Sequence, residues 1–224
     1  MTEYPLQLIF FVGQIIILYF ISRVTVQETF YFFAHFTRSQ RVIFSLVSTV
    51  FFVGTVLHEM AHFLMAVGLM LRVHDVKIFP EWEGNSIKLG RVLYEKKDFV
   101  RGILVGIAPI FAGVYFFWLV AYWSQIFQGN IPLQAVIIYL MFVISTTMFS
   151  SKQDLIDIVF ILPVFLIVGA GMYILNLPVL SVFMSLLPFV NPTLLLINHY
   201  LLYSVLIHIG LIALCKSLRY FKRR

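Results

Sequence analysis

Long apolar segments are the feature that most constrains how this chain can fold. A helix needs about 20 apolar residues to cross about 30 Å of hydrocarbon. Six segments are suited to this: 6–22, 42–71, 101–123, 131–149, 156–177 and 194–215. A shorter apolar stretch, 179–189, is bounded by prolines, so it is expected to be re-entrant or part of a broken helix. We predict an all-α polytopic membrane protein with about six transmembrane helices, forming a single integral membrane domain over residues 1–224.

The composition excludes most other classes. Hydrophobic residues make up 61% of the 224 residues and charged residues only 12%, whereas soluble domains have about 25% charged residues. A water-soluble globule of this composition could not cover its surface with polar groups. The single cysteine, Cys215, excludes an internal disulfide and a cysteine-rich zinc cage. The net charge of +6 is interpreted as a signal of orientation in the lipid bilayer, and no nucleic-acid partner is expected.

The distribution of basic residues predicts an orientation. With six spans, the N-terminus, the loops 72–100 and 150–155 and the C-terminus share one side of the membrane. Of the 16 Lys and Arg residues, all except Arg23, Arg38 and Arg41 fall on that side, which gives thirteen against three. Cytoplasmic loops carry the excess of basic residues. We therefore predict a multi-pass protein with both termini in the cytoplasm.

The loop after the second apolar segment has a strand-like pattern. Apolar and charged residues alternate on both sides of Glu83-Gly84-Asn85-Ser86, with the apolar positions at Val76, Ile78, Ile87, Leu89, Val92 and Tyr94. Alternation around a Gly-Asn turn predicts a small amphipathic β-hairpin at the membrane surface. An irregular basic loop bound to anionic lipid headgroups is the alternative.

The second apolar segment contains His58-Glu59-Met60-Ala61-His62. Residues four apart on a helix face the same way, so both imidazoles could bind one Zn²⁺, and Glu59 could take a proton from a zinc-bound water. The expected chance count of this H-E-x-x-H pattern here is roughly 0.004. Ionisable residues inside an apolar span are costly and usually mark a function. The alternative is a pair of hydrogen-bonded core histidines with Glu59 as their ion-pair partner.

A catalytic zinc takes three protein ligands and keeps a fourth position for water. The favoured third ligand is Asp154, which opens the fifth apolar segment together with Asp157. Both acids fall on the predicted cytoplasmic side, toward which the motif helix runs. Helix capping by Ser151, with the acids in the first turn, explains both aspartates without a metal.

Other candidate ligands are weaker. Glu81 and Glu83 fall in the predicted hairpin turn, and His74 lies just past the motif helix, where it is expected to be solvated. His199 and His208 are nine residues apart on the last segment, hence on opposite helix faces, and cannot jointly bind one metal. We expect each of these two histidines to be a core or interfacial residue.

These residues resemble the intramembrane zinc metalloproteases of the site-2 protease class and related zincin-type membrane peptidases. The resemblance rests on the motif inside a span, the β-like segment after it, Gly106-Ile107-Ala108-Pro109 in the next span and an acidic residue near a later one. It implies a metalloprotease-like core over about residues 42–160. It also implies that His58 and His62 bind zinc together with Asp154, and that Glu59 is the catalytic base.

The chain also departs from the family pattern. The Asn-Pro-Asp-Gly-like signature is absent, and Ser151-x-x-Asp154 stands where it would be expected. Asn191-Pro192 has only the first two letters, falls after the fifth segment and is interpreted as a helix start.

The expected function is a zinc-dependent endopeptidase that cleaves membrane-associated or transmembrane proteins and peptides, with Glu59 as general base. The predicted hairpin offers an edge on which an extended substrate could pair. The alternative is a non-catalytic membrane protein whose His-Glu-His cluster binds metal structurally or relays ions. A diiron hydroxylase is disfavoured, because six scattered histidines cannot supply its repeated histidine boxes.

Overall fold

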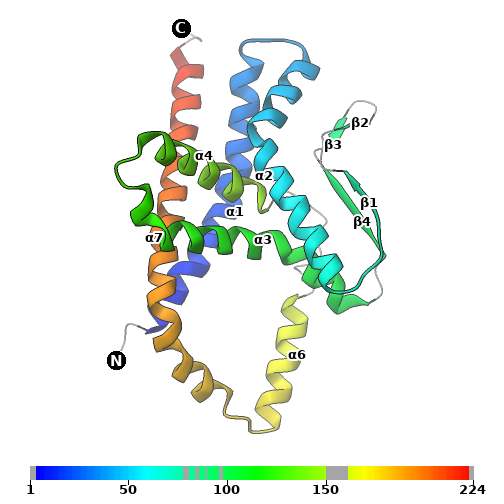
Figure 1. Cartoon of the computed structure of the whole chain (residues 1–224), viewed down its shortest axis with the longest axis vertical. Helices are drawn as coiled ribbons and strands as arrows, with labels where there is room; N and C mark the ends of the chain where they lie inside the picture. Colours follow the sequence, from blue (N-terminus) through cyan, green and yellow to red (C-terminus); the bar gives the residue numbers. More distant parts are fainter. Residues whose placement is uncertain are drawn as a thin grey trace.

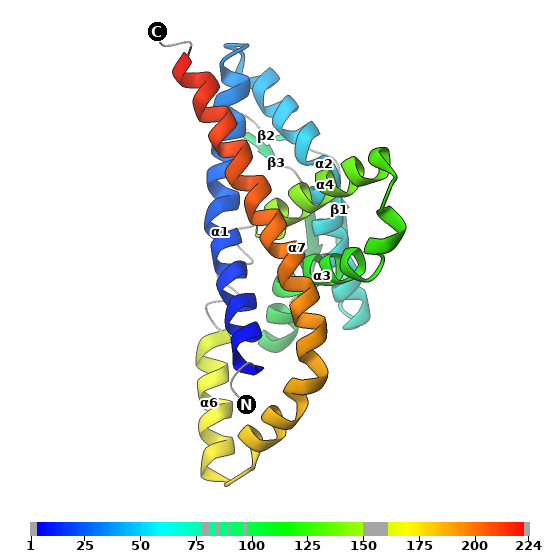
Figure 2. The ribbon, with the colours of Figure 1, turned by 90° about the vertical axis from the view of Figure 1, so that its left-hand side faces the viewer.

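The computed structural model describes residues 4–77, 81–83, 86–88, 90–95, 98–149 and 161–221. These residues are mostly helical. The helices are α1 (Tyr4–Ala34), α2 (Gln40–Gly68), α3 (Phe99–Tyr122), α4 (Ile131–Thr147), α6 (Ile161–Ile174) and α7 (Val179–Phe221), with a short 3₁₀ helix η1 (Ser124–Phe127). Figures 1 and 2 show α1 and α7 side by side along the long axis, with α3 and α4 running across them.

Four of these helices, α1, α2, α3 and α7, are long and apolar enough to cross a membrane. Helix α4 has 17 residues, which is shorter than a typical span, and α6 is described over 14 residues. The helical class is confirmed, while the described residues provide four candidate spans where six were predicted. The stretch 179–189 is part of α7, which continues through Pro188 and Pro192 and curves in its N-terminal half (Figure 1).

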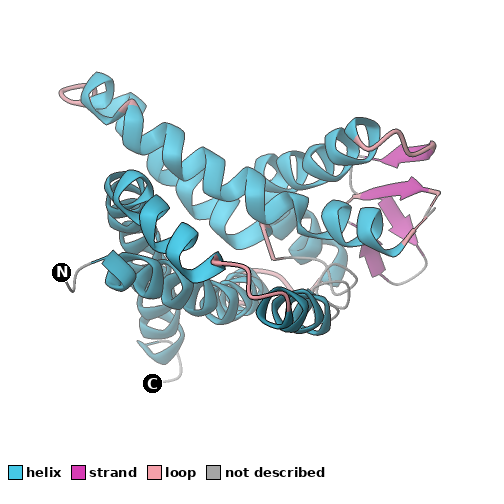
Figure 3. Ribbon diagram, turned by 90° about the horizontal axis from the view of Figure 1, so that it is seen from below, coloured by secondary structure: helices cyan, strands magenta, loops and turns pink. Residues whose placement is uncertain are grey.

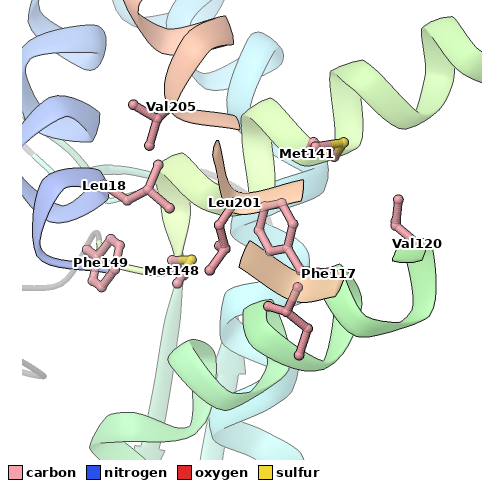
Figure 4. Packing of buried hydrophobic residues seen from close by; sticks show 9 residues of the cluster. Leu18, Phe117, Val120, Met141, Met148, Phe149, Leu201 and Val205 are labelled. Atoms are coloured by element: carbon pink, nitrogen blue, oxygen red, sulfur yellow. The ribbon is translucent and has the colours of Figure 1, made fainter. Parts of the chain in front are cut away.

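Helix α4 is the centre of the packing. One buried cluster joins α1, α3, α4 and α7 and is drawn in Figure 4; it contains Leu18, Phe117, Val120, Met141, Met148, Phe149, Ile197, Leu201 and Val205. A second cluster joins α2 to α4 through Ile43, Val47, Phe51, Phe142, Val143 and Ile144. The C-terminal half of α4 is therefore held from two sides, and α2 packs directly against it.

A buried polar network ties the same helices together. His208 is 0% exposed, and its Nδ1 lies 2.8 Å from Thr25 Oγ1 while its Nε2 lies 3.0 Å from Ser145 Oγ. The hydroxyl of Ser204 donates to Ser145 Oγ at 2.8 Å. The prediction that His208 is a core histidine is confirmed, and His199 is exposed on the same helix.

The strands form antiparallel pairs at one side of the helices (Figure 3), where β1 and β4 contact α2. Strand β1 (Val73–Lys77) pairs with β4 (Arg91–Tyr94), and β2 (Glu81–Glu83) pairs with β3 (Ser86–Lys88). The predicted hairpin is therefore present, although Glu81 and Glu83 lie on β2 and not in the turn. Strand pairing extends up to Glu83, which lies opposite Ser86 in the register of β2 and β3.

The sheet is fixed to the ends of α2 and α3. Asp98 caps α3 by accepting from the Arg101 backbone N–H at 2.8 Å, and the Arg101 guanidinium donates to the Leu69 carbonyl just after α2, at 3.3 Å. A small apolar cluster formed by Ala66, Leu71 and Val105 packs with Val73 and Tyr94 from β1 and β4. The strands therefore have a defined position relative to α2.

Helices α1 and α7 run in the same direction. The Asn198 amide donates to the Gln7 carbonyl at 2.9 Å, and Arg219 pairs with Glu28 at 3.0 Å near the other end of both helices. The two termini lie at opposite ends of this pair (Figure 1), and the predicted cytoplasmic location of both termini is not tested by the fold. The basic end of α7 lies with the loop that carries Arg38, and the orientation predicted from the thirteen-to-three charge division stays a prediction.

Site-specific labelling tests this parallel arrangement. In a Cys215→Ser background, we expect single cysteines at Ser39 and Ser217, both exposed positions, to react with a membrane-impermeant maleimide from the same side of intact cells. A cysteine at exposed Asn176, before α7, should react only from the other side. The Cys215→Ser protein without an added cysteine is the control. Labelling of positions 39 and 217 from opposite sides would contradict the arrangement.

Candidate functional site

The Nε2 atoms of the two motif histidines face each other. His58 and His62 lie on α2 and are only 4% and 8% exposed, and their Nε2 atoms are 3.1 Å apart. Two nitrogen ligands at about 2.0–2.1 Å from one tetrahedral zinc are about 3.4 Å apart. The spacing of four residues therefore brings the two rings together, and this distance fits both a hydrogen-bonded histidine pair and two imidazole ligands of one metal ion.

A hydrogen bond to α3, which contains Pro109, sets the orientation of the His62 ring. His62 Nδ1 lies 2.8 Å from the carbonyl oxygen of Val105 on α3. In a regular helix that carbonyl would accept from the N–H of residue 109, but Pro109 has none. A carbonyl can only accept, so Nδ1 carries the proton and Nε2 keeps its lone pair facing His58. A hydrogen bond of this kind fixes the tautomer and ring orientation of a metal-binding histidine.

This contact was not predicted from the sequence. Pro109 was noted only as part of Gly106-Ile107-Ala108-Pro109, through the resemblance. The sequence signal that could have found it is the proline itself, because a proline inside an apolar helix leaves an unfilled acceptor four residues earlier. That reasoning identifies the Val105 carbonyl as a free acceptor. Only the fold shows that His62 Nδ1 forms the hydrogen bond to it.

Substitution of Pro109 tests the role of this carbonyl. In Pro109→Ala the restored N–H competes for the Val105 oxygen. If His58 and His62 bind zinc, the zinc affinity should fall about tenfold, which is the smaller of the effects expected when a metal-binding histidine loses its hydrogen-bond partner. Chelator competition on the purified protein measures the affinity. Pro192→Ala, the same substitution inside α7, is the matched control and should leave the affinity unchanged. An unchanged affinity in Pro109→Ala would show that this carbonyl does not orient His62.

The motif glutamate lies against the segment that leads into β4. Glu59 is 9% exposed. A Cβ added at Gly90 would lie 2.5 Å from Glu59 Cγ and 2.8 Å from its Oε1. Any side chain at position 90 would therefore displace Glu59 or the strand. Gly90 is needed here for a close approach of backbone to side chain, and the sheet forms a wall of the site at the carboxylate.

A methyl group at position 90 should disturb the carboxylate without touching the histidines. We expect Gly90→Ala to slow a reaction that uses the Glu59 carboxylate about 100-fold, a cost typical of a misplacement of about 1 Å, while metal binding by the histidines is unchanged. Gly68→Ala, on the motif helix with open space around its Cβ, is the control and should keep its activity. The two variants are compared by cleavage rate and by metal analysis of the same samples. Full activity in Gly90→Ala would show that this approach does not position Glu59.

Helix α4 ends beside the motif helix. A Cβ at Gly54, one turn before His58, would lie 2.6 Å from both Thr147 Oγ1 and the Val143 carbonyl oxygen. The α2 and α4 backbones therefore approach closely at this point. Thr147 and His58 also line the same cavity. The last turn of α4 therefore lies close to the part of α2 that carries the histidine pair.

The predicted third metal ligand falls outside the described residues. Asp154 and Asp157 belong to the segment 150–160, which the structure does not describe. In the part of the chain that is described, no group of three His, Cys, Asp or Glu side chains could hold a metal ion. His74 is exposed on β1, and the side chains of Glu81 and Glu83 are likewise outside the description. Ligation by Asp154 stays a prediction.

No protein-family model, no curated protein and no solved structure matches this chain. The chemical interpretation therefore depends on the geometry of the site. Two buried imidazoles face one point, a nearly buried carboxylate follows the first of them on the same helix, and a proline-released carbonyl fixes the second. These groups could bind a metal ion and handle a proton beside it.

Proposed function

We propose that this chain is a membrane-embedded, zinc-dependent endopeptidase. The observation that carries the proposal is the His58–His62 pair, whose Nε2 atoms are 3.1 Å apart and whose second ring is anchored on Val105. When bound, zinc would polarise the scissile carbonyl and lower the pKa of a water molecule to near 7. The resemblance of the motif to the site-2 protease class supports the same assignment.

Glu59 is the proposed general base. It would accept the proton of the attacking water and deliver it to the leaving amine. Its burial supports this role, because the packing around a buried carboxylate limits the positions that the side chain can take. The close approach of Gly90 limits where the side chain can go.

Asp154 is the proposed third ligand, with Asp157 as the second choice. Residues 150–160 follow α4, whose last turn packs on α2 next to His58. An extended chain can cover about 3.3–3.6 Å per residue, so the chain length between Thr147 and Asp154 would allow this carboxylate to reach the histidine pair. A carboxylate oxygen is a suitable partner for two imidazoles on zinc.

The proposed substrates are membrane-associated or transmembrane proteins and peptides. Four helices of the chain are long and apolar enough to cross a membrane, which supports a multi-pass protein that meets its substrate in the bilayer. A helical substrate has its backbone groups paired internally and must unwind before attack. Strand β4 is at the edge of the two-stranded sheet that it forms with β1, and an unwound segment could pair there beside Glu59.

Mapping of new protein N-termini tests this function without a known substrate. Membranes from cells that produce the wild-type chain are compared, by mass spectrometry of N-terminal peptides, with membranes containing Glu59→Gln or His62→Ala. We expect new N-termini inside or next to apolar segments in the wild type, absent from both variants and from chelator-treated samples. Identical sets of N-termini in all samples would contradict the proposal.

A further inference from the structure

We propose that the cavity beside His58 receives one apolar side chain of the substrate, next to the bond that is cut. This inference depends on the proposed peptidase function, because it assigns a specificity pocket to the same site. The cavity has a volume of about 260 Å³ and lies between α2, α3 and the end of α4. Its lining is predominantly apolar and includes Leu57, Ala61, Leu64, Ala112, Phe116 and Ile144.

The size and chemistry of the cavity define its occupant. An apolar cavity of about 150 Å³ is enough to bind benzene, so 260 Å³ accommodates a Leu, Met or Phe side chain. Small residues at Ala61, Ala112 and Gly113 create this space. The polar groups in the lining are few, and the Thr147 hydroxyl already donates to the Val143 carbonyl at 2.9 Å. A charged side chain would lose its water there without gaining partners.

The position of the cavity connects it to the reaction. His58 is both a candidate metal ligand and part of the cavity wall. Glu59, the next residue on the helix, packs against Gly90, which directly precedes β4. A carbonyl at the histidine pair would thus lie between the cavity and β4. Side chains alternate along an extended segment, so a substrate paired toward β4 directs a neighbouring side chain into the cavity.

Photocross-linking tests this inference without turnover. The full chain with Glu59→Gln, in lipid nanodiscs, is mixed with synthetic Leu/Ala-rich transmembrane peptides that each carry one benzoylphenylalanine, moved along the sequence. We expect at least one position to cross-link to Met60, Leu64 or Ala112. Ala112→Leu should lower that cross-link at least tenfold, because it fills the cavity from an exposed position on α3. Ala135→Leu, at an exposed position of α4 outside the cavity lining, is the matched control and should not lower it.

Two results would overturn the inference. One is cross-linking of the peptides only to residues outside the cavity. The other is labelling of the cavity by a phospholipid with a photoreactive acyl chain, to the same extent in the presence and absence of excess peptide. That result would show that the cavity is a lipid site. The cross-linking experiment uses only Glu59→Gln and therefore does not depend on cleavage. A wild-type protein that fails to cleave would contradict the proposed function, and the cross-linking result would still show whether a peptide side chain occupies the cavity.

Discussion

Glu59→Gln is expected to lower the cleavage rate at least about 100-fold while the protein folds and keeps its zinc. The amide has nearly the shape of the carboxylate, so the contact with Gly90 is retained, but it cannot accept a proton. General acid–base catalysis contributes about 10²–10⁴-fold, and we expect a loss of that size in the cleavage rate. Rate and zinc content are measured on the same preparation. Glu28→Gln is the matched control, because Glu28 is also buried but pairs with Arg219 away from the motif.

The control separates a specific effect from a general one. Glu28→Gln weakens an ion pair between α1 and α7 and should lower stability more than it lowers the cleavage rate per folded molecule. A fully active Glu59→Gln would show that another group handles the proton. A Glu59→Gln protein without zinc would indicate instead that Glu59 helps to hold the metal, as a closed structural site would require.

Loss of either motif histidine is the second change with a large expected effect. His62→Ala removes one proposed ligand together with the contact to Val105, and His58→Ala removes the facing nitrogen. We expect each variant to lose most of its zinc and all detectable cleavage, because the remaining ligands rarely retain Zn²⁺ on dilution. Metal analysis after gel filtration measures this.

His208→Ala is the matched control for the histidine variants. His208 is also a buried histidine, but its ring nitrogens contact Thr25 and Ser145 far along the chain from the motif. Its removal leaves buried hydroxyls with fewer partners and should lower the unfolding temperature without changing the zinc content. If His208→Ala loses zinc to the same extent as His62→Ala, the metal loss reflects general destabilisation.

The parts of the site that are local in sequence could be predicted, and the parts that depend on tertiary contacts could not. The facing of His58 and His62 follows from the helical repeat alone. The Val105 carbonyl is 43 residues from His62, and the approach of Gly90 to Glu59 depends on how the sheet is attached to α2. Neither pairing has a sequence pattern that specifies its partner.

The same distinction explains the differences in the fold. Apolar segments predicted helices correctly, but hydropathy ended the first segment at residue 22, whereas α1 continues to Ala34. The extension is possible because its polar residues have partners: Arg23 lies over the Tyr19 ring at 4.6 Å, and Glu28 pairs with Arg219. The parallel alignment of α1 and α7 depends on such contacts, which charge counting does not include.

X-ray absorption at the zinc edge of the purified wild-type protein tests the central claim most directly. The account predicts one zinc per chain with two imidazole nitrogens and otherwise oxygen ligands at about 2.0–2.2 Å, the oxygen ligands including the carboxylate proposed for Asp154. In His58→Ala/His62→Ala this signal should be absent. A wild-type protein without zinc, or with a zinc shell that contains no imidazole, would contradict the assignment of this site.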